Sequence, residues 1–555
     1  MNDAATAVDV TLTLNLVGGL YTLGAAGTTS ATLTIKNLPV PEGWNTWVAC
    51  GESRLASLDA NWSAGHAPRA DEKVLFDGRF STLSCEWDAD APQTVAGWKQ
   101  TEGYTGAIIF CTTFEAYNRT FTNLTINGNV ELECGSWTHK DHKAADAWAQ
   151  VYHLAATVTG DFTLGANAKL TVNGKGKRVN KNFWGACYGG TGGKYEDRNG
   201  EDSLTVFGET FGSVTEPTDL GVSASADDGY SGSDPVAWAG GAIHLQVGGQ
   251  LTLAGNVYAN GLTQEGWNTS TGSGGSIYLK AASISGSGNV QANGGGSGGS
   301  RCNQCGSGGR IALVVTADEL ALPLDKVTVQ GGSVYAFQAA SGTIFVKTGK
   351  SVNGTLYMKF NNVYGAYAYH PSSRLTTAIP AGETWTFDAI VFSGKGVLRV
   401  PTGTKLVLPN GLGSVTGNDY EGGLLLDGGA LEVPAEAASC TGQWMLMMHA
   451  DTVIPCGLQL NGPKIGPVST FRRLAKDFAG GHTVKVSGPV TLAGDSTFDL
   501  RGDAYTTGKV VQGTDKLTSG TFTAASAGLS AVIDTTTEKN GTLTIKGSGV
   551  VIVVR

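Results

Sequence analysis

A phrase of two small residues, one variable residue and isoleucine recurs four times in the middle of the chain and most restricts its fold. The phrases are Gly240-Gly-Ala-Ile243, Gly274-Gly-Ser-Ile277, Gly308-Gly-Arg-Ile311 and Ser341-Gly-Thr-Ile344. The isoleucines are 34, 34 and 33 residues apart (277 − 243, 311 − 277, 344 − 311). A second phrase recurs between them, as Asn256-Val-Tyr-Ala-Asn-Gly261, Asn289-Val-Gln-Ala-Asn-Gly294 and Lys326-Val-Thr-Val-Gln-Gly331. Two phrases in a fixed order at near-constant spacing indicate a repeat architecture.

Helical tetratricopeptide arrays have a similar period, but the residues argue against helices. Apolar residues come in short or alternating runs, such as Ile277-Tyr-Leu and Asn289-Val-Gln-Ala, and glycines separate these runs. Each glycine inside a helix costs about 1 kcal/mol relative to alanine. We therefore predict an all-β fold in which each ~34-residue unit forms one coil of three short strands, and the coils stack in parallel as a β-solenoid. Long loops, residues 262–273 and 295–307, would lie on the third side.

Composition excludes several other classes of protein. The chain has 555 residues, of which 81 are glycines without a Gly-X-Y period, so it is not a collagen. Charged residues make up 15% and hydrophobic residues 41%, which argues against disorder. The net charge of −9 argues against nucleic acid as a partner. The chain contains no apolar run of about 18 residues, so no membrane span is predicted.

Four regions follow from the distribution of strand-like runs. Residues 1–40 alternate like a β-hairpin with a turn at Gly18-Gly19, and residues 41–135 are expected to be N-terminal capping coils. The glycine-rich solenoid would occupy residues 136–350, with a polar, partly helical insert at 136–153 and a loop excursion at 175–238. Residues 351–555 are expected to continue the solenoid or to form a second β domain.

Three tryptophans precede the repeats: Trp62, Trp87 and Trp98. An open solenoid end exposes unpaired strand edges and apolar interior, which large aromatic side chains can cover. We expect these tryptophans to form such a cap. The alternative is a platform on which sugar rings stack.

The glycine-rich phrases of residues 187–315 resemble the repeats of very large bacterial surface proteins. These repeats are similar to pectin-lyase-like, right-handed parallel β-helices and to autotransporter passenger domains. The resemblance rests on Gly272-Ser-Gly-Gly-Ser-Ile-Tyr-Leu, Ser285-Gly-Ser-Gly-Asn-Val-Gln-Ala-Asn-Gly and Gly306-Ser-Gly-Gly-Arg-Ile-Ala-Leu. It implies a right-handed parallel β-helix at the bacterial cell surface. The β-helix superfamily also includes polysaccharide lyases and glycosidases, and fold does not imply function.

Residues 21–35 resemble the final strands of a Calx-β-type immunoglobulin-like module. This resemblance implies that the chain begins inside a β-sandwich fragment and belongs to a longer polypeptide. No basic segment followed by an apolar run, as in a signal peptide, is visible after Met1. We therefore expect an excised part of a secreted protein.

An acidic loop contains the candidate catalytic residues Asp227, Asp228 and Asp234. Paired carboxylates are what glycosidase chemistry requires, because one donates a proton while the other attacks or activates water. Such a loop can also bind Ca²⁺ through carboxylate and carbonyl oxygens. A turn without ligand is the third interpretation. No other cofactor is expected.

A basic run with aromatic neighbours contains the candidate glycan-binding residues Lys175, Lys177, Arg178, Lys181, Trp184 and Tyr188. Positive charge beside aromatic faces is the composition expected of a site for acidic polysaccharide. A solvated loop is the alternative. The variable residue Arg310, at the start of a strand, is expected to be one member of a ladder.

Histidines and cysteines suggest further sites. His139 and His142, with Cys134 and His153, have the side-chain types of a zinc site, but their spacing matches no known pattern, and surface histidines are the alternative. Nine cysteines cannot all pair with one another. Cys302 with Cys305, and Cys440 with Cys456, are candidate local disulfides.

Three functions remain open from the sequence. The first is a non-catalytic extracellular β-solenoid of a bacterial surface protein, a stalk or adhesin that contacts polysaccharide or host glycans. The second is a polysaccharide lyase or glycoside hydrolase with a site on the excursion at 175–238. The third is a phage tail-spike-like, glycan-binding protein.

Overall fold

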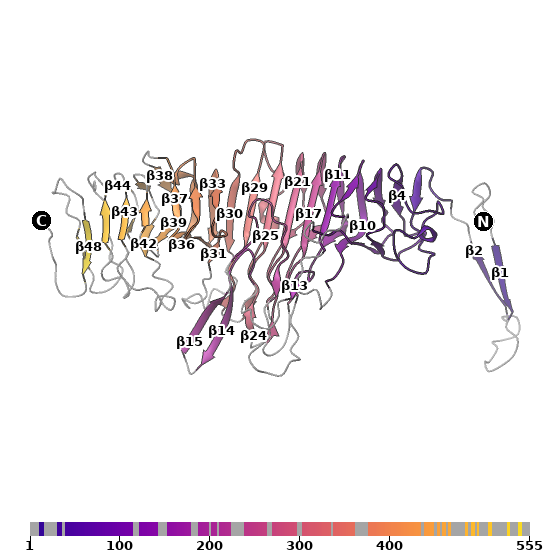
Figure 1. Ribbon diagram of the computed structural model, residues 1–555, viewed down its shortest axis with the longest axis horizontal. Helices are drawn as coiled ribbons and strands as arrows, with labels where there is room; N and C mark the ends of the chain where they lie inside the picture. Colours follow the sequence, from indigo (N-terminus) through magenta and orange to yellow (C-terminus); the bar gives the residue numbers. More distant parts are fainter. Residues whose placement is uncertain are drawn as a thin grey trace.

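The computed structural model is an elongated array of short β-strands that stand side by side (Figure 1). Its described helices are single 3-10 turns, η1 Asp59–Asn61, η4 Leu324–Lys326 and η6 Leu412–Ser414. The structure describes residues 10–15, 30–35, 39–114, 121–142, 152–178, 187–198, 201–207, 210–223, 238–263, 269–296, 302–334, 337–360, 376–434 and 438–448, and thereafter only the strands named below. The predicted all-β class is confirmed.

Most strands belong to two large, mainly parallel sheets. The first contains β3 Trp44–Thr46, β4 Lys73–Phe76, β5 Cys85–Trp87, β7 Gly97–Gln100, β8 Ala107–Phe110, β10 Val130–His139, β12 Phe162–Thr171, β18 Gln250–Leu253, β19 Asn256–Tyr258, β22 Ser283–Gly286, β23 Val290–Gln291 and β26 Val327–Thr328. The second contains β6 Thr94–Val95, β9 Leu124–Ile126, β11 Leu154–Val158, β17 Ala242–Val247, β21 Ser276–Ala281, β25 Arg310–Val315, β29 Thr343–Lys347, β30 Thr355–Phe360, β31 Thr377–Ala378, β33 Ala389–Gly394, β34 Val397–Pro401, β36 Val415–Asp427, β39 Gln443–Met448, β42 Lys464–Pro467 and β45 Thr497–Phe498.

Smaller sheets complete the described fold. One is the antiparallel hairpin β1 Val10–Asn15 and β2 Ser30–Ile35; its connection spans residues 16–29, so the strands do not pair directly across Gly18-Gly19 as expected. Those beside the array contain β13 Lys177–Arg178 with β16 Val222–Ser223, β14 Gly192–Arg198 with β15 Glu201–Phe207, β20 Thr269–Ser270 and β24 Cys302–Cys305, and β27 Ser333–Val334 with β28 Phe337–Gln338. Those of the C-terminal part contain β32 Thr384–Thr386, β35 Lys405–Val407, β37 Ala430–Glu432, β38 Ala438–Thr441, β40 Thr452–Ile454, β41 Leu458–Asn461, β43 Thr483–Val486, β44 Val490–Ala493, β46 Lys509–Gln512, β47 Ser530–Val532 and β48 Thr542–Lys546.

The spacing of the sequence repeat is the pairing register of the second sheet. Strands β17, β21, β25 and β29 pair in parallel so that the four repeat isoleucines are direct partners. These are Ile243, Ile277, Ile311 and Ile344, and all four side chains are fully buried. Each strand therefore lies on its predecessor at the ordinary strand separation of about 4.8 Å.

One repeat unit consists of three short strands joined by two tight corners and one long connection. From β17 the chain turns at Gly248-Gly249 into β18, turns at Ala254-Gly255 into β19, and returns through residues 259–275 to β21. At Gly288 the corner leaves no room for a side chain, since a Cβ there would lie 1.8 Å from the carbonyl oxygen of Gly255. Inward side chains on all three strands form one buried apolar core. Both the two short corners and the long connection agree with the sequence prediction.

A ladder of amides follows the last strand of each unit. The Oδ1 atom of Asn173 accepts a hydrogen bond from the backbone N–H of Asn260 (2.7 Å), and Asn260 in turn accepts one from Asn293 (2.7 Å). Asn293 accepts one from the N–H of Gln330 (2.8 Å). Asn260 and Asn293 close the recurring Val-Xaa-Ala-Asn phrase, and Gln330 closes its looser final copy. The side-chain oxygens thus satisfy main-chain donors where the chain leaves the sheet.

The N-terminal part of the core is filled by aromatic side chains. Trp62, Trp87 and Trp98 are at most 2% exposed, and their ring centroids are separated by 6.1 Å and then 4.9 Å. The series continues through Trp137 to Phe162 at 5.3 Å each. Because the rings contact one another inside the array, they cannot serve as a surface platform for sugar. The rings thus belong to the core of the N-terminal part, and their role as a cap over an open end stays a prediction.

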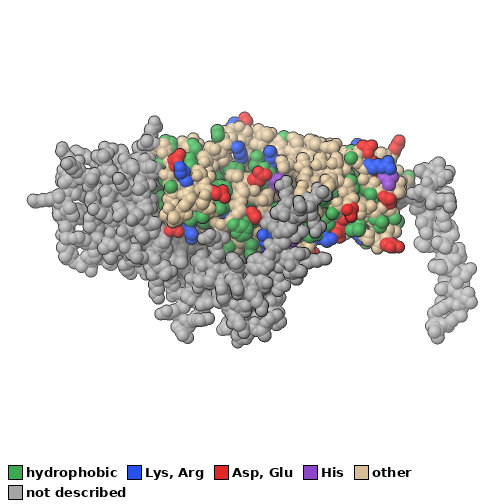
Figure 2. Space-filling model, viewed as in Figure 1, with side chains coloured by type: hydrophobic (Ala, Val, Ile, Leu, Met, Phe, Trp, Pro, Cys, Tyr) green, Lys and Arg blue, Asp and Glu red, His purple; other side chains and the backbone are tan. Residues whose placement is uncertain are grey.

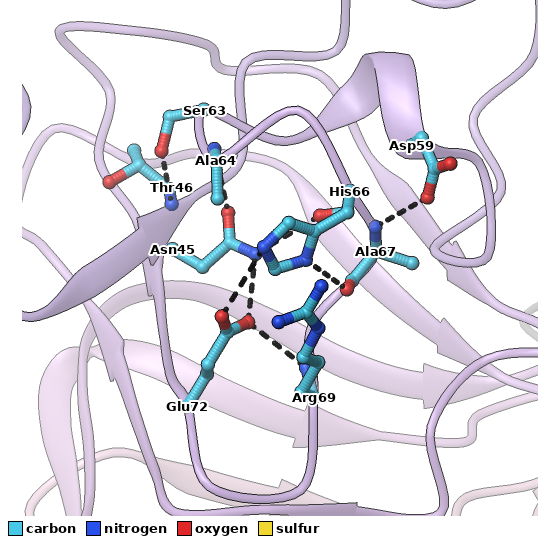
Figure 3. Close-up of polar contacts among 9 residues, drawn as sticks. All are labelled: Asn45, Thr46, Asp59, Ser63, Ala64, His66, Ala67, Arg69 and Glu72. Atoms are coloured by element: carbon cyan, nitrogen blue, oxygen red, sulfur yellow. Dashed lines mark hydrogen bonds and ion pairs between the residues drawn. The ribbon is translucent and has the colours of Figure 1, made fainter.

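A polar loop covers the N-terminal edge strand β3 (Figure 3). The N–H of Ser63 donates to the carbonyl oxygen of Thr46, whose own N–H donates to Ser63 Oγ, each at 2.9 Å. Asn45 donates through Nδ2 to the carbonyl oxygen of His66 (3.1 Å) and to the Glu72 carboxylate (3.2 Å). The loop therefore occupies hydrogen-bonding groups that another strand could otherwise use.

The second sheet reverses strand direction once. β29 and β30 pair antiparallel, with Ile344 opposite Tyr357 and Phe345 opposite Leu356, and β30 then pairs in parallel with β33. The core changes side at the same place. Ile344 belongs to the apolar cluster of the first part, whereas Phe345, Leu356 and Met358 belong to a second cluster. The sheet is therefore buried on both faces here, a feature absent from the sequence prediction.

The amide ladder generates a stability prediction. Asn293→Ala should lower the free energy of unfolding by about 1 kcal/mol, because the Gln330 N–H loses its acceptor in a partly buried position. Equilibrium urea unfolding measures the change. Asn293→Asp keeps an acceptor oxygen and should lose less, and Gln291→Ala, at the end of the preceding strand β23, is the matched control. If Asn293→Ala and Gln291→Ala lowered the free energy of unfolding equally, the amide ladder would make no specific contribution to stability.

Candidate functional site: a glycine-rich lobe beside the array

The long connections of successive repeat units gather on one side of the array, where β13, β14, β15 and β24 project (Figure 1). We call this the lobe, and define it by its described segments, residues 173–178, 187–198, 201–207, 210–223, 238–241, 259–263, 269–275, 292–296, 302–309, 329–334 and 337–342. Its largest sheet has the order β15-β14-β24-β20 and thus combines three separate connections. The lobe is the part of the described chain in which loops distant in sequence meet.

Each connection leaves and re-enters the array as two main-chain segments in direct contact. The hydrogen bond between them recurs in successive units, from Gly275 N to the Ala259 oxygen (2.8 Å) and from Gly309 N to the Ala292 oxygen (2.7 Å). A Cβ on Gly261 would lie only 2.0 Å from the carbonyl oxygen of Gly272. No side chain fits between the two segments at this point.

Glycines also connect one repeat unit to the next. Gly274 N donates to the carbonyl oxygen of Ser307, and Gly308 N donates to that of Ala340, both at 2.9 Å. A Cβ on Gly275 would lie 1.9 Å from the carbonyl oxygen of Gly241. The paired glycines that precede Ile277 and Ile311 are therefore needed for contact within a unit and between units.

A buried guanidinium joins the lobe to the array. Arg310 begins β25 and is fully buried; its Nε donates to the carbonyl oxygen of Phe211 and its Nη1 donates to Thr343 Oγ1, each at 3.0 Å. The guanidinium carbon lies 5.6 Å from the ring centroid of Tyr188. Burial lowers the pKa of Arg310 to about 10, while the Tyr188 ring and the Asp219 carboxylate oppose that shift. Arg310 remains a cation at neutral pH.

Tyr188 and Ser276 extend this contact. The Tyr188 hydroxyl and Ser276 Oγ are 2.5 Å apart, and Ser276 Oγ also donates to the carbonyl oxygen of Asp219. Ser276, Arg310 and Thr343 are pairing partners on adjacent strands, so Arg310 is a ladder residue as expected. The sequence did not reveal its burial. The sequence signal that could have indicated this burial is the large charged residue at a repeat position where the other units have the small residues Ala242, Ser276 and Thr343.

The predicted basic and aromatic residues do not form one exposed surface. Lys175 pairs with the Asp141 carboxylate at 2.6 Å, and burial lowers the pKa of Lys177. Tyr188 is fully buried, which leaves its ring no face for a sugar; in this respect the expectation is corrected. The backbone of Arg178 lies in β13. The Arg178 side chain, Lys181 and Trp184 lie outside the described residues.

The predicted acidic site and disulfides stay predictions. Asp227, Asp228 and Asp234 lie outside the described residues, and so do the side chain of Cys302 and all of Cys456. Cys305 and Cys440, the other halves of the two proposed disulfides, are both fully buried. The catalytic, Ca²⁺ and disulfide interpretations are therefore not tested.

The histidines differ from the expectation of an exposed polar insert. β10 extends through His139, so residues 136–139 are strand and not helix. His139, His142 and His153 are at most 7% exposed, and the first two rings lie 5.9 Å apart between centroids. Burial beside apolar strands is what the spacing alone could not reveal. Within the described ranges, no three His, Cys, Asp or Glu side chains are placed to hold a metal ion, so we assign no ligand role to these histidines.

Comparisons of the chain with family models, curated proteins and solved structures find no match in any of the three. Across the part of the chain that the structure describes, no helix has the length and apolar character needed to cross a membrane. The site is therefore interpreted from its own geometry.

The buried guanidinium generates the second prediction. Arg310→Met should destabilise the lobe by about 1–3 kcal/mol, because it leaves the part-buried Phe211 carbonyl and the buried Thr343 hydroxyl without their hydrogen-bond donor. Limited proteolysis should cleave the lobe segments at 187–192 and 210–223 faster, while far-ultraviolet circular dichroism keeps its β signal. Lys280→Met removes an exposed cation from the neighbouring strand and is the matched control. Unchanged cleavage in Arg310→Met would contradict the assigned role.

Proposed function

We propose that the chain forms a right-handed parallel β-helix. The support is the repeat unit itself, in which three strands separated by two corners and one long connection return to pair in parallel with the preceding unit. Crossover connections between parallel strands of one sheet are right-handed in about 98% of cases. The same rule applies to every unit from β10 to β29.

The reversal at β29 and β30 is compatible with one handedness throughout. Reversing the strand direction alone would reverse the winding about the long axis. Moving the core to the opposite face of the sheet reverses it a second time. Both changes occur together, because Ile344 faces the first core while Leu356 faces the second. The units after residue 355 then wind in the same sense as those before it.

We propose further that this β-helix is a non-catalytic, extracellular part of a larger bacterial surface protein, a stalk or adhesin that presents the lobe to polysaccharide or host glycans. The observation that carries the proposal is that successive units add length along one axis and place their long connections on one side. Such quasi-one-dimensional folds create extended surfaces.

Outside the lobe, the face that Figure 2 shows is suited to neutral or weakly charged partners. Figure 2 shows scattered charged side chains, with mostly uncharged polar side chains and backbone between them. Several charges are paired with one another, as Lys99 is with Glu131 (2.7 Å) and Lys405 with Glu432 (2.9 Å). Lys175 and Lys177 are the described cations of the basic run in the lobe, and we propose that they contact anionic groups of a glycan.

A glycan array with acidic and neutral polysaccharides tests the proposal. We expect binding to acidic polysaccharide that weakens about tenfold, or about 1.4 kcal/mol, in the double variant Lys175→Ala and Lys177→Ala. The double variant Lys280→Ala and Lys347→Ala removes the same charge from two strands outside the lobe and should bind normally. If the protein binds no glycan on the array, the proposed glycan contact is wrong and a role as a spacer remains.

The same samples distinguish the alternative functions. New reducing ends or absorbance from unsaturated uronate would indicate a polysaccharide hydrolase or lyase and would overturn the non-catalytic proposal. A stable trimer that cleaves sugar would indicate a tail-spike-like protein. Light scattering coupled to size-exclusion chromatography measures the oligomeric state.

A further inference from the structure

Three imidazoles meet where the lobe joins the array. His139 ends β10, His142 follows three residues later, and His153 directly precedes β11. The His153 ring lies 3.9 Å, between centroids, from the ring of Phe114. His139 Nε2 points at the lobe, since a Cβ added to Gly241 would lie 2.2 Å from it. The cluster thus contacts both large sheets and the lobe segment 238–241.

The proton of His139 is placed by its hydrogen bond. Nδ1 lies 2.9 Å from the carbonyl oxygen of Lys140, which only accepts, so Nδ1 carries the hydrogen and Nε2 is bare. Buried Nε2 has no hydrogen-bond partner, and neither has Nδ1 of His153. A proton added at either nitrogen would be buried without an acceptor, which costs on the order of several kcal/mol for a charged group.

The charged groups around the cluster do not compensate such a proton. Within the described residues, the carboxylates at its edge already have partners: Glu86 pairs with Lys140, Asp141 with Lys175, and Glu216 with the imidazole of His244. Two further titratable groups beside the cluster, in the part of the chain that the structure describes, are the Tyr152 phenol, whose ring lies 5.8 Å from that of His142, and the Cys111 thiol, which donates to Glu86. The lysines add positive potential and oppose protonation further.

These surroundings fix the direction of the pH effect. Burial lowers the pKa of His139 well below its usual value, with the neighbouring histidines and Lys175 adding to the effect, and burial lowers the pKa of His153 to about 3. In an opened segment each imidazole returns to a pKa of about 6.5. Between about pH 6.5 and 3 the opened form therefore binds more protons, so the closed form is favoured above this range and disfavoured as the pH falls through it.

We propose that the histidine cluster, His139, His142 and His153, is an acid-sensitive latch that holds the base of the lobe closed at neutral pH and opens it locally in mild acid. Opening frees the end of β10, the start of β11 and segment 238–241. The strands β21 and β25 stay paired, because their contacts do not involve the cluster. This inference goes beyond the proposed function and does not depend on it.

Hydrogen–deuterium exchange of the full chain at pH 7.5, 6.5, 5.5 and 4.5, corrected for the intrinsic pH dependence of exchange, tests the latch. Each histidine that must gain a proton contributes up to about tenfold per pH unit to the opening equilibrium. For His139 and His153 together we expect protection at 134–142, 154–158 and 238–241 to fall about a hundredfold per pH unit below pH 6. Protection in β21 and β25 should change far less.

The double variant His139→Phe and His153→Phe should lose this pH dependence while keeping protection at pH 7.5, since phenylalanine fills the same apolar space and cannot titrate. Should the double variant fail to fold, each single variant should remove about tenfold per pH unit. His66→Phe, in the N-terminal loop, is the control and should behave like wild type. Equal pH dependence in wild type and variants, or loss of protection spread evenly over all strands, would overturn the latch.

Discussion

Close contact between main chains is the constraint on which the lobe and the array both depend. Strands of a sheet are about 4.8 Å apart, so a connection repeated in every unit must also rise by that distance. Loops can stack at this separation only where no side chains come between them. Gly274 and Gly308 meet that condition within the repeats, and both donate main-chain hydrogen bonds to the next unit. The high glycine content is therefore a consequence of extending the stack into the loops.

The two ends of the first core are filled by different kinds of side chain. In the regular units, inward Ile, Leu and Val side chains of similar size lie over one another and fill the interior. Towards the N-terminus the strands follow no fixed period, and indole rings occupy the larger gaps. Their polar N–H groups are satisfied inside the core, as where Gln100 Oε1 accepts from Trp98 at 3.3 Å and from Trp137 at 2.6 Å. Buried tryptophan thus remains compatible with a dry interior.

Sequence reasoning was most successful where the structure repeats. The spacing of Ile243, Ile277 and Ile311 predicted the strands, their parallel register and the position of the long loops. It could do so because pairing partners occupy equivalent places in each unit. It failed where a single position departs from the repeat. The reversal of strand direction after Lys347 depends on a second core, which no local sequence pattern predicts. The burial of His139 and Arg310 depends on segments that are distant in sequence. The candidate acidic site lies outside the described residues, so its prediction is unchanged.

The in-register stack also bears on how such a chain can change in length. Each central unit ends in the same relation to its neighbour as it began, with Ile277 above Ile243 and Asn293 above Asn260. Duplication or loss of one whole 33- or 34-residue unit would thus preserve the register of the isoleucines and of the amide ladder, although not the contacts that Arg310 and Ser276 make with the lobe. A change of a few residues would shift the isoleucine face, the amide ladder and the glycine contacts together. Unequal recombination between the encoding repeats could lengthen or shorten the array stepwise, leaving the aromatic N-terminal part and its polar loop untouched.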